Sequence, residues 1–106
     1  PGTIPASISK CSKTLKINLQ FSNLAGEIPS GIGNLTLMSI LILNDNQLSG
    51  RMPHGLGELA SLEGVTFQNN LLSGKFPDQM FNCSKLLHFL IYNNLLEGPI
   101  PSSISM

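Results

Sequence analysis

A 24-residue period constrains this chain more than any other feature of its sequence. Glycine recurs at that step, and a proline follows each glycine after three residues. The two sets are Gly2, Gly26, Gly50, Gly74 and Gly98, and Pro5, Pro29, Pro53, Pro77 and Pro101. One apolar residue precedes each proline, which gives GTIP, GEIP, GRMP, GKFP and GPIP. Self-similarity at such a period predicts tandem structural units that stack on one another.

The apolar residues recur at the same step. Two columns separated by two residues alternate with polar positions, which is typical of a short strand with one buried face. They are Ile17, Leu41, Val65 and Phe89, followed by Leu19, Leu43, Phe67 and Ile91. Further inward columns follow the prolines, at Ile8, Ile32, Leu56, Met80 and Ile104, and at Cys11, Leu35, Leu59 and Cys83. One period cannot bury these groups alone, so the periods must stack.

Polar and special residues recur after each strand. Asn46, Asn70 and Asn94 form a column, with Ser22 at the same place in the first period. An amide side chain both donates and accepts, so this column predicts a structural asparagine ladder that satisfies backbone groups of the turns. The recurrent glycine predicts positive φ or a close backbone approach, and the proline predicts the end of the extended piece.

Length and composition exclude several classes of protein. The chain has 106 residues, a formal net charge of zero and only 11% charged residues. That is enough for one domain, and it offers no basic footprint for nucleic acid or an anionic membrane. No apolar run approaches the roughly 18 residues of a membrane helix, and the N-terminal residues do not follow the order of a signal peptide. We therefore expect no nucleic-acid partner and no direct membrane insertion by this segment.

The segment LMSILILNDNQLSGRMPHGLGEL, within the columns above, resembles the plant-type leucine-rich repeat. The resemblance covers essentially the whole chain. It implies an α/β repeat solenoid, a right-handed curved superhelix with a parallel β-sheet on its concave face and short 3-10 or irregular segments on its convex face. Residues 1–106 would form a single solenoid of about four 24-residue repeats. Such repeats occur in the ectodomains of plant receptor-like kinases and receptor-like proteins, and in secreted polygalacturonase inhibitors.

Two departures from the repeat lead to separate expectations. In the first period Thr14 occupies a leucine position, Leu15 follows one residue late and Ser22 replaces asparagine, which predicts an irregular strand at residues 15–19. The paired-cysteine caps of such solenoids are missing, and the chain begins and ends partway through a repeat. We therefore expect an uncapped fragment of a longer ectodomain or a truncated gene product.

The cysteines and histidines do not form a reactive site in this register. Cys11 and Cys83 lie three periods apart, so their Cα atoms should be about 14 Å or more apart, too far for a disulfide. We expect two free, buried core thiols. His54 follows the repeat's proline whereas His88 lies on a strand, so they should face different surfaces without a third ligand. No catalytic motif is present, and we expect no enzyme activity, no metal and no cofactor.

Surface positions carry the functional expectations. Asn34 and Asn82 begin N-x-[ST] sequons two periods apart and are candidate glycosylation sites on one flank. Outward strand residues form three columns on the concave sheet: Lys16, Ile40, Gly64 and His88; Asn18, Ile42, Thr66 and Leu90; and Gln20, Asn44, Gln68 and Tyr92. Apart from Gly64, we predict that these residues contact ligand. The alternatives are scattered exposed apolar residues and contacts with other parts of a receptor.

These observations lead to two functional hypotheses. The first is a ligand-recognition segment of a plant leucine-rich-repeat receptor, binding a peptide or protein signal outside the cell and bridging to a co-receptor ectodomain. Any Ser/Thr kinase domain of the parent would lie outside this chain. The alternative is a secreted leucine-rich-repeat protein of the apoplast, such as a polygalacturonase inhibitor or an ice-binding protein.

Overall fold

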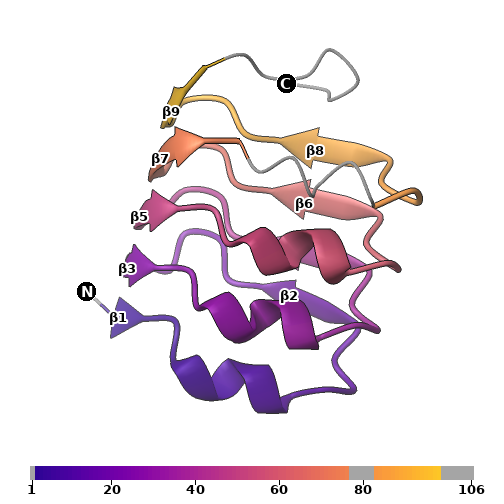
Figure 1. The fold of residues 1–106 in the computed structure, drawn as a ribbon. Helices are drawn as coiled ribbons and strands as arrows, with labels where there is room; N and C mark the ends of the chain where they lie inside the picture. The colour runs from indigo at the N-terminus through magenta and orange to yellow at the C-terminus, as the bar shows by residue number, and fades with distance from the viewer. Residues whose placement is uncertain (1, 77–82, 99–106) are drawn as a thin grey trace.

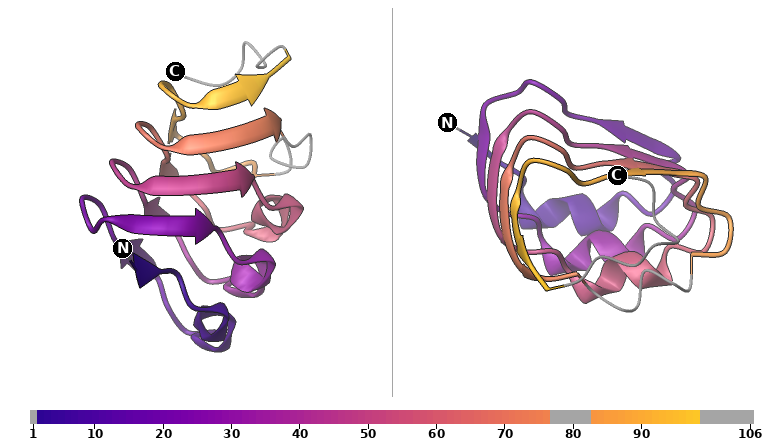
Figure 2. Two further views of the ribbon diagram at one scale, coloured as in Figure 1. Left: turned by 90° about the vertical axis from the view of Figure 1, so that its left-hand side faces the viewer. Right: turned by 90° about the horizontal axis from the view of Figure 1, so that it is seen from above.

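Each 24-residue period forms one coil of a solenoid (Figure 1). The structure is a computed structural model, and it describes residues 2–76 and 83–98. Two parallel sheets and a row of 3-10 helices form the sides of the coils (Figure 2, right). This arrangement confirms the fold class expected from the repeat.

The first sheet contains the strands that the alternating apolar residues predict. It has the order β2-β4-β6-β8, with β2 at Lys16–Asn18, β4 at Ile40–Ile42, β6 at Gly64–Thr66 and β8 at His88–Leu90. All pairs are parallel, and residues 24 apart are partners. Because the register equals the repeat length, equivalent side chains of successive coils align across the sheet.

A second sheet and the 3-10 helices complete each coil. The five strands of the second sheet are β1 at Gly2–Thr3, β3 at Leu24–Glu27, β5 at Gln47–Arg51, β7 at Leu71–Lys75 and β9 at Leu95–Glu97. The 3-10 helices are η1 at Ala6–Lys10, η2 at Ser30–Asn34 and η3 at His54–Glu58. Each helix begins directly after the repeat's proline, whose extended backbone ends the preceding strand region. Gly26, Gly50, Gly74 and Gly98 have φ between 75° and 80°, as their recurrence predicted.

The core fills the space between the two sheets and the 3-10 helices. Leucine, isoleucine and methionine side chains of the middle coils are almost fully buried, including Leu41, Leu43 and Leu59. Toward the C-terminal coils, aromatic rings replace them, and Phe89 packs against Phe67 and Phe76 with ring centroids 6.1 and 5.4 Å away. The inward columns therefore join into one continuous core along the stack.

The expected irregularity of the first strand is wrong. The N–H of Ser39 donates to the Leu15 carbonyl at 2.8 Å, and the N–H of Glu63 donates to the Ser39 carbonyl at the same distance. The first strand is regular because its register depends on its inward residues, and the first coil keeps Ile17 and Leu19. The departure lies instead in the following turn, where two non-glycine residues have positive φ and the later coils have one each. The first coil has Phe21 and Asn23, and the others have Asp45, Asn69 and Asn93.

The expectation of two buried thiols is wrong for Cys11, which is exposed, while Cys83 is buried and free. Cys11 belongs to the first described coil, and among the described residues only the second coil packs against that coil. Thr14 is also smaller than Met38, which occupies the corresponding place in the next coil and is fully buried. Burial raises the pKa of the Cys83 thiol, and its Sγ lies 3.4 Å from the carbonyl oxygen of Leu56.

Candidate ligand-binding surface

The four-stranded sheet presents a mixed polar and apolar outer face. The middle residue of each strand is buried in the core, so the two residues beside it face outward. Lys16, Asn18 and His88 are exposed, whereas Ile40, Ile42, Thr66 and Leu90 are half-buried. The structure thus brings these seven predicted residues together on one sheet.

The centre of this face is apolar. Ile40 and Ile42 on β4 are followed across the sheet by Gly64 and Thr66 on β6, and then by His88 and Leu90 on β8. A Cβ placed on Gly64 would meet no atom within 4 Å. The face therefore lacks a side chain between Ile40 and His88. Apolar side chains beside an open position are suited to receive a side chain of a binding partner.

The residues of the third predicted column differ in how far they are exposed. Gln20 and Tyr92 are exposed, and Gln68 is half-buried. Asn44 retains only 6% of its accessible surface. Its Nδ2 donates to Asp45 Oδ2 at 2.6 Å, and its Oδ1 accepts a hydrogen bond from the Thr66 hydroxyl at 2.9 Å. The expectation that Asn44 lies freely on the surface is therefore wrong, because its amide joins a hydrogen-bond network.

A second ladder of polar side chains borders this face and was missed from the sequence. Asn69 Nδ2 donates to Asp45 Oδ1 at 2.9 Å, and Asn93 Nδ2 donates to Asn69 Oδ1 at 2.7 Å. All three residues have φ near 60°, which Asn and Asp tolerate better than other side chains. Their recurrence every 24 residues was the available signal, but Phe21 interrupts the column in the first coil.

Asn46, Asn70 and Asn94, which the repeat predicts to be structural, form hydrogen bonds with the backbone. Asn70 Nδ2 donates to the carbonyls of Leu43, on the preceding coil, and of Phe67, on its own. Its Oδ1 accepts from the N–H of Leu48. Asn46 and Asn94 make the corresponding bonds one coil earlier and later. Each side chain thus ties two successive coils together.

Asn34 and His54 lie on 3-10 helices, apart from the concave face. Asn34, the last residue of η2, is exposed, while Asn82 lies outside the described residues. His54 begins η3 and His88 begins β8, so the two histidines lie on different sides of the coil. Among the described residues, no three His, Cys, Asp or Glu side chains gather in a way that could hold a metal ion. Nor does any helix in residues 2–76 and 83–98 have the length and apolar character to cross a membrane.

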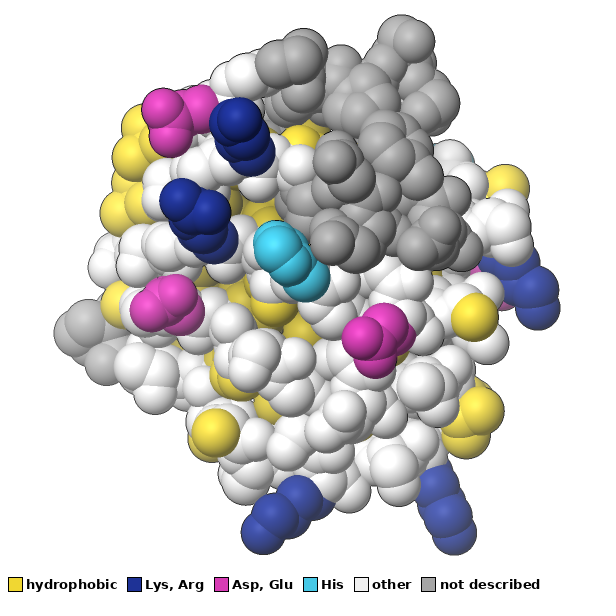
Figure 3. Space-filling model, viewed as in Figure 1, with side chains coloured by type: hydrophobic (Ala, Val, Ile, Leu, Met, Phe, Trp, Pro, Cys, Tyr) yellow, Lys and Arg dark blue, Asp and Glu magenta, His cyan; other side chains and the backbone are white. Residues whose placement is uncertain are grey.

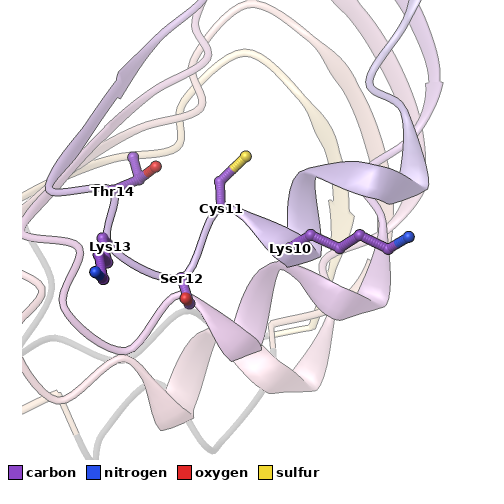
Figure 4. A pocket seen from close by; sticks show the side chains of 5 residues that line it. All are labelled: Lys10, Cys11, Ser12, Lys13 and Thr14. Carbon is purple, nitrogen blue, oxygen red and sulfur yellow. The ribbon is translucent and has the colours of Figure 1, made fainter.

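A pocket of about 510 Å³ lies over the turn between η1 and β2 (Figure 4). Five consecutive residues line it, from Lys10 to Thr14, and they include the exposed Cys11. All five come from a single segment. The pocket therefore brings together no groups from different coils, unlike the concave face.

The stacked coils, the two parallel sheets and the asparagine ladder define a leucine-rich-repeat solenoid of the plant type. The chain resembles the ectodomains of plant receptor kinases. It superposes on the plant peptide hormone receptor RGFR1, solved in complex with RGF2, with a TM-score of 0.92 and 32% identity over 94% of this chain. It also superposes on the Arabidopsis receptor kinase HAESA, solved with the peptide hormone IDA and the co-receptor SERK1. The TM-score is 0.89, and the sequences are 35% identical over 96% of this chain. The BIR2 ectodomain from Arabidopsis thaliana superposes with a TM-score of 0.90 and 33% identity over 94% of this chain.

These relatives are longer than the chain. It covers 16% of RGFR1, 17% of HAESA and 53% of BIR2 in those structures. No protein-family model and no curated protein matches the sequence. The solved structures therefore show that the chain has the leucine-rich-repeat fold of plant receptor-kinase ectodomains and spans part of their length.

Proposed function

We propose that this chain is a ligand-recognition segment of a plant leucine-rich-repeat receptor kinase or receptor protein, binding a peptide or protein signal in immunity or development. Recognition takes place outside the cell, in a membrane-anchored parent or in the apoplast. The observation that carries the proposal is the apolar centre of the concave sheet, formed by Ile40, Ile42 and Leu90 beside the open position at Gly64. RGFR1 and HAESA, solved with peptide hormones, support a peptide as the ligand.

The polar surroundings give such a ligand its orientation. Lys16, Asn18 and His88 are exposed around the apolar centre and offer charged and hydrogen-bonding groups to a peptide backbone. The Thr66 hydroxyl is already engaged with Asn44, so the two residues act as a rigid border. By analogy with HAESA, a co-receptor ectodomain joins the bound complex. The chain acts by recognition, and any kinase activity belongs to residues outside it.

The test uses four peptides that the solved relatives bind: RGF2, AtPEP1, IDA and CASPARIAN STRIP INTEGRITY FACTOR 2. Each is titrated into the chain by calorimetry beside a scrambled version. We expect at least one to bind in preference to its scrambled form. Ile42→Ser should weaken that binding by about tenfold, because it removes roughly 1.5 kcal/mol of apolar contact.

Leu71→Ser is the matched control, since Leu71 is 49% exposed on the second sheet. It removes an apolar side chain of the same size from a different face and should leave the affinity unchanged. Equal losses in the two variants would contradict a concave site. Inhibition of a fungal polygalacturonase or of ice recrystallisation, with no binding of any peptide, would assign the chain to the secreted class instead.

A further inference from the structure

A groove lies across the core from the concave sheet, where the second sheet meets the 3-10 helices. The groove has a volume of about 400 Å³ and is lined by residues of the second and third coils. They are Glu27, Ile28, Pro29 and Ser30, and Arg51, Met52, Pro53 and His54. Figure 3 shows apolar surface between acidic, basic and histidine side chains on this face. The groove shares no residue with the concave surface, so an inference about it does not rest on the proposed function.

The floor and walls of the groove are apolar and already in place. Ile28 and Met52 lie at the bottom with 4% and 2% of their surface accessible. Pro29 and Pro53 are half-buried above them, with φ of −60° and −68°. A proline has a fixed φ and no backbone N–H, so these walls present no unsatisfied donor and lose little freedom when something binds.

The charged residues of the rim follow the glycine column of the second sheet. Glu27 on β3 and Arg51 on β5 line the groove, and Lys75, just outside its lining, occupies the same repeat position on β7. A Cβ on Gly50 would lie 2.7 Å from Glu27 Cγ, and one on Gly74 would lie 3.0 Å from Arg51 Cγ. Each long side chain therefore lies flat across the glycine of the next coil, which fixes its position on the rim. The charge changes from negative to positive along the stack.

The spacing of these charges matches a short extended peptide. Neighbouring strands of a sheet are about 4.8 Å apart, so the row of charged residues from Glu27 on β3 to Lys75 on β7 spans about 10 Å. Three extended residues cover a similar length at about 3.3 Å each. The volume of about 400 Å³ lies near the lower end of the range for small-ligand sites. The groove therefore suits a few residues of a chain rather than a folded domain.

We propose that this groove binds an extended peptide segment in which one apolar residue is flanked by a basic residue and an acidic residue. The apolar side chain lies between Pro29 and Pro53. The basic side chain faces Glu27, and the acidic side chain faces Arg51 and Lys75. An arginine can hold a carboxylate through two parallel hydrogen bonds, which makes the Arg51 end the more selective one.

The proposal is tested with acetyl-Lys-Leu-Asp-amide, titrated into the full chain labelled with nitrogen-15. Backbone amide signals of residues 27, 28, 30, 51, 52 and 54 should shift saturably, with a Kd in about the millimolar range for so small a ligand. Signals of the four-stranded sheet should not move. Two control peptides, with serine in place of leucine or lysine in place of aspartate, should bind at least about tenfold more weakly.

Arg51→Glu provides the sharper test, because it should reverse the preference between two peptides. The Lys-Leu-Asp peptide should lose about tenfold in affinity, while the Lys-Leu-Lys peptide should gain. Lys85→Glu makes the same charge change on an exposed turn before β8 and should leave both affinities unchanged. A merely structural role of Arg51 would not reverse the preference.

Three results would overturn the proposal. The first is the absence of any saturable shift at peptide concentrations up to about 20 mM, well above the expected Kd. The second is a shift pattern confined to β2, β4, β6 and β8. The third is an equal effect of Arg51→Glu and Lys85→Glu, which would show a response to net charge alone. Circular dichroism of each variant confirms that the fold is retained.

Discussion

Single side chains at repeated positions differ because their neighbours differ. Asn70 and Asn44 are each 6% exposed, yet only Asn70 belongs to the column that the repeat predicts to be structural. Asn44 is buried because Thr66 and Asp45 bond its amide. Repetition reveals which residues share a position, but it does not reveal partners that occur in one coil only. The burial of Asn44 was therefore beyond the reach of the sequence pattern.

The two cysteines provide a prediction at this scale. In the folded chain, one thiol should react with an aromatic disulfide reagent at once and the other only as slowly as the protein opens. Cys11 is exposed, whereas Cys83 is buried and burial raises its pKa, so little of its reactive thiolate forms at pH 8. Absorbance of the released thiolate measures both phases. Cys83→Ser should abolish the slow phase and Cys11→Ser the fast one.

The raised pKa of Cys83 also fixes the sign of a pH effect. Its folded value lies above the unfolded value of 9.0, so the contribution of the protonated thiol to stability is fully present below that value. It is lost as the pH rises through the folded pKa. Two equally fast thiols at pH 8 would contradict the burial of Cys83.

Gly50 on the second sheet and Gly64 on the four-stranded sheet differ in backbone conformation, so alanine should have opposite effects on stability at the two positions. Gly50→Ala should destabilise the chain by about 1–2 kcal/mol, since φ is 76° there and the new Cβ would lie 2.7 Å from Glu27 Cγ. Gly64→Ala should stabilise it by about 0.4–1 kcal/mol, because β6 is extended and nothing lies within 4 Å of the new Cβ. Urea denaturation followed by circular dichroism measures both changes. A loss of stability in both variants would contradict the open position at Gly64.

The sequence predicted the two sheets unequally, for a physical reason. Strands of the concave sheet carry two inward apolar residues in alternation, as Leu41 and Leu43 do, and this is the pattern by which a half-buried strand is recognised. The second sheet has segments such as QLSGR, with Leu48 alone fully buried. Such segments become strands because the neighbouring coil supplies parallel partners at a fixed spacing. That pairing belongs to the stack and leaves no alternation in a single period.

The sequence likewise predicted the concave surface but not the groove on the second sheet. Once the strands were placed, alternation alone assigned the outward positions of β4 and β8, including Ile42 and Leu90. The groove at Arg51 was not predicted, because it forms between coils, and the repeat of a single period predicted only the backbone conformation at its glycine and proline. The charges of its rim differ from coil to coil, so the repeat pattern treats them as variable surface positions.

The whole molecule is stabilised by contacts between successive coils. Each asparagine of the ladder bonds the backbone of two coils, and the inward columns join into one core. Stability in such a stack is a sum over coils and the interfaces between them. Damage to a middle coil therefore removes two interfaces. The loss should extend beyond the coil that carries the substitution.

Leu43→Asp tests this coupling. Leu43 is 1% exposed on a middle coil, so the substitution buries an unpaired charge and removes packing against both neighbours. We expect a loss above about 4 kcal/mol, with hydrogen exchange accelerated in β2 and β6 as well as beside β4. Leu37→Asp is the matched control, because Leu37 is 51% exposed, and it should cost less than about 0.5 kcal/mol. Asn44→Asp would not be a neutral surface substitution, because the new carboxylate would face Asp45. The variant would also lose the amide donor that Asn44 supplies to Asp45. Faster exchange confined to residues near position 43, with β2 and β6 unchanged, would show that the coils fold independently and that the stack is not the unit of stability.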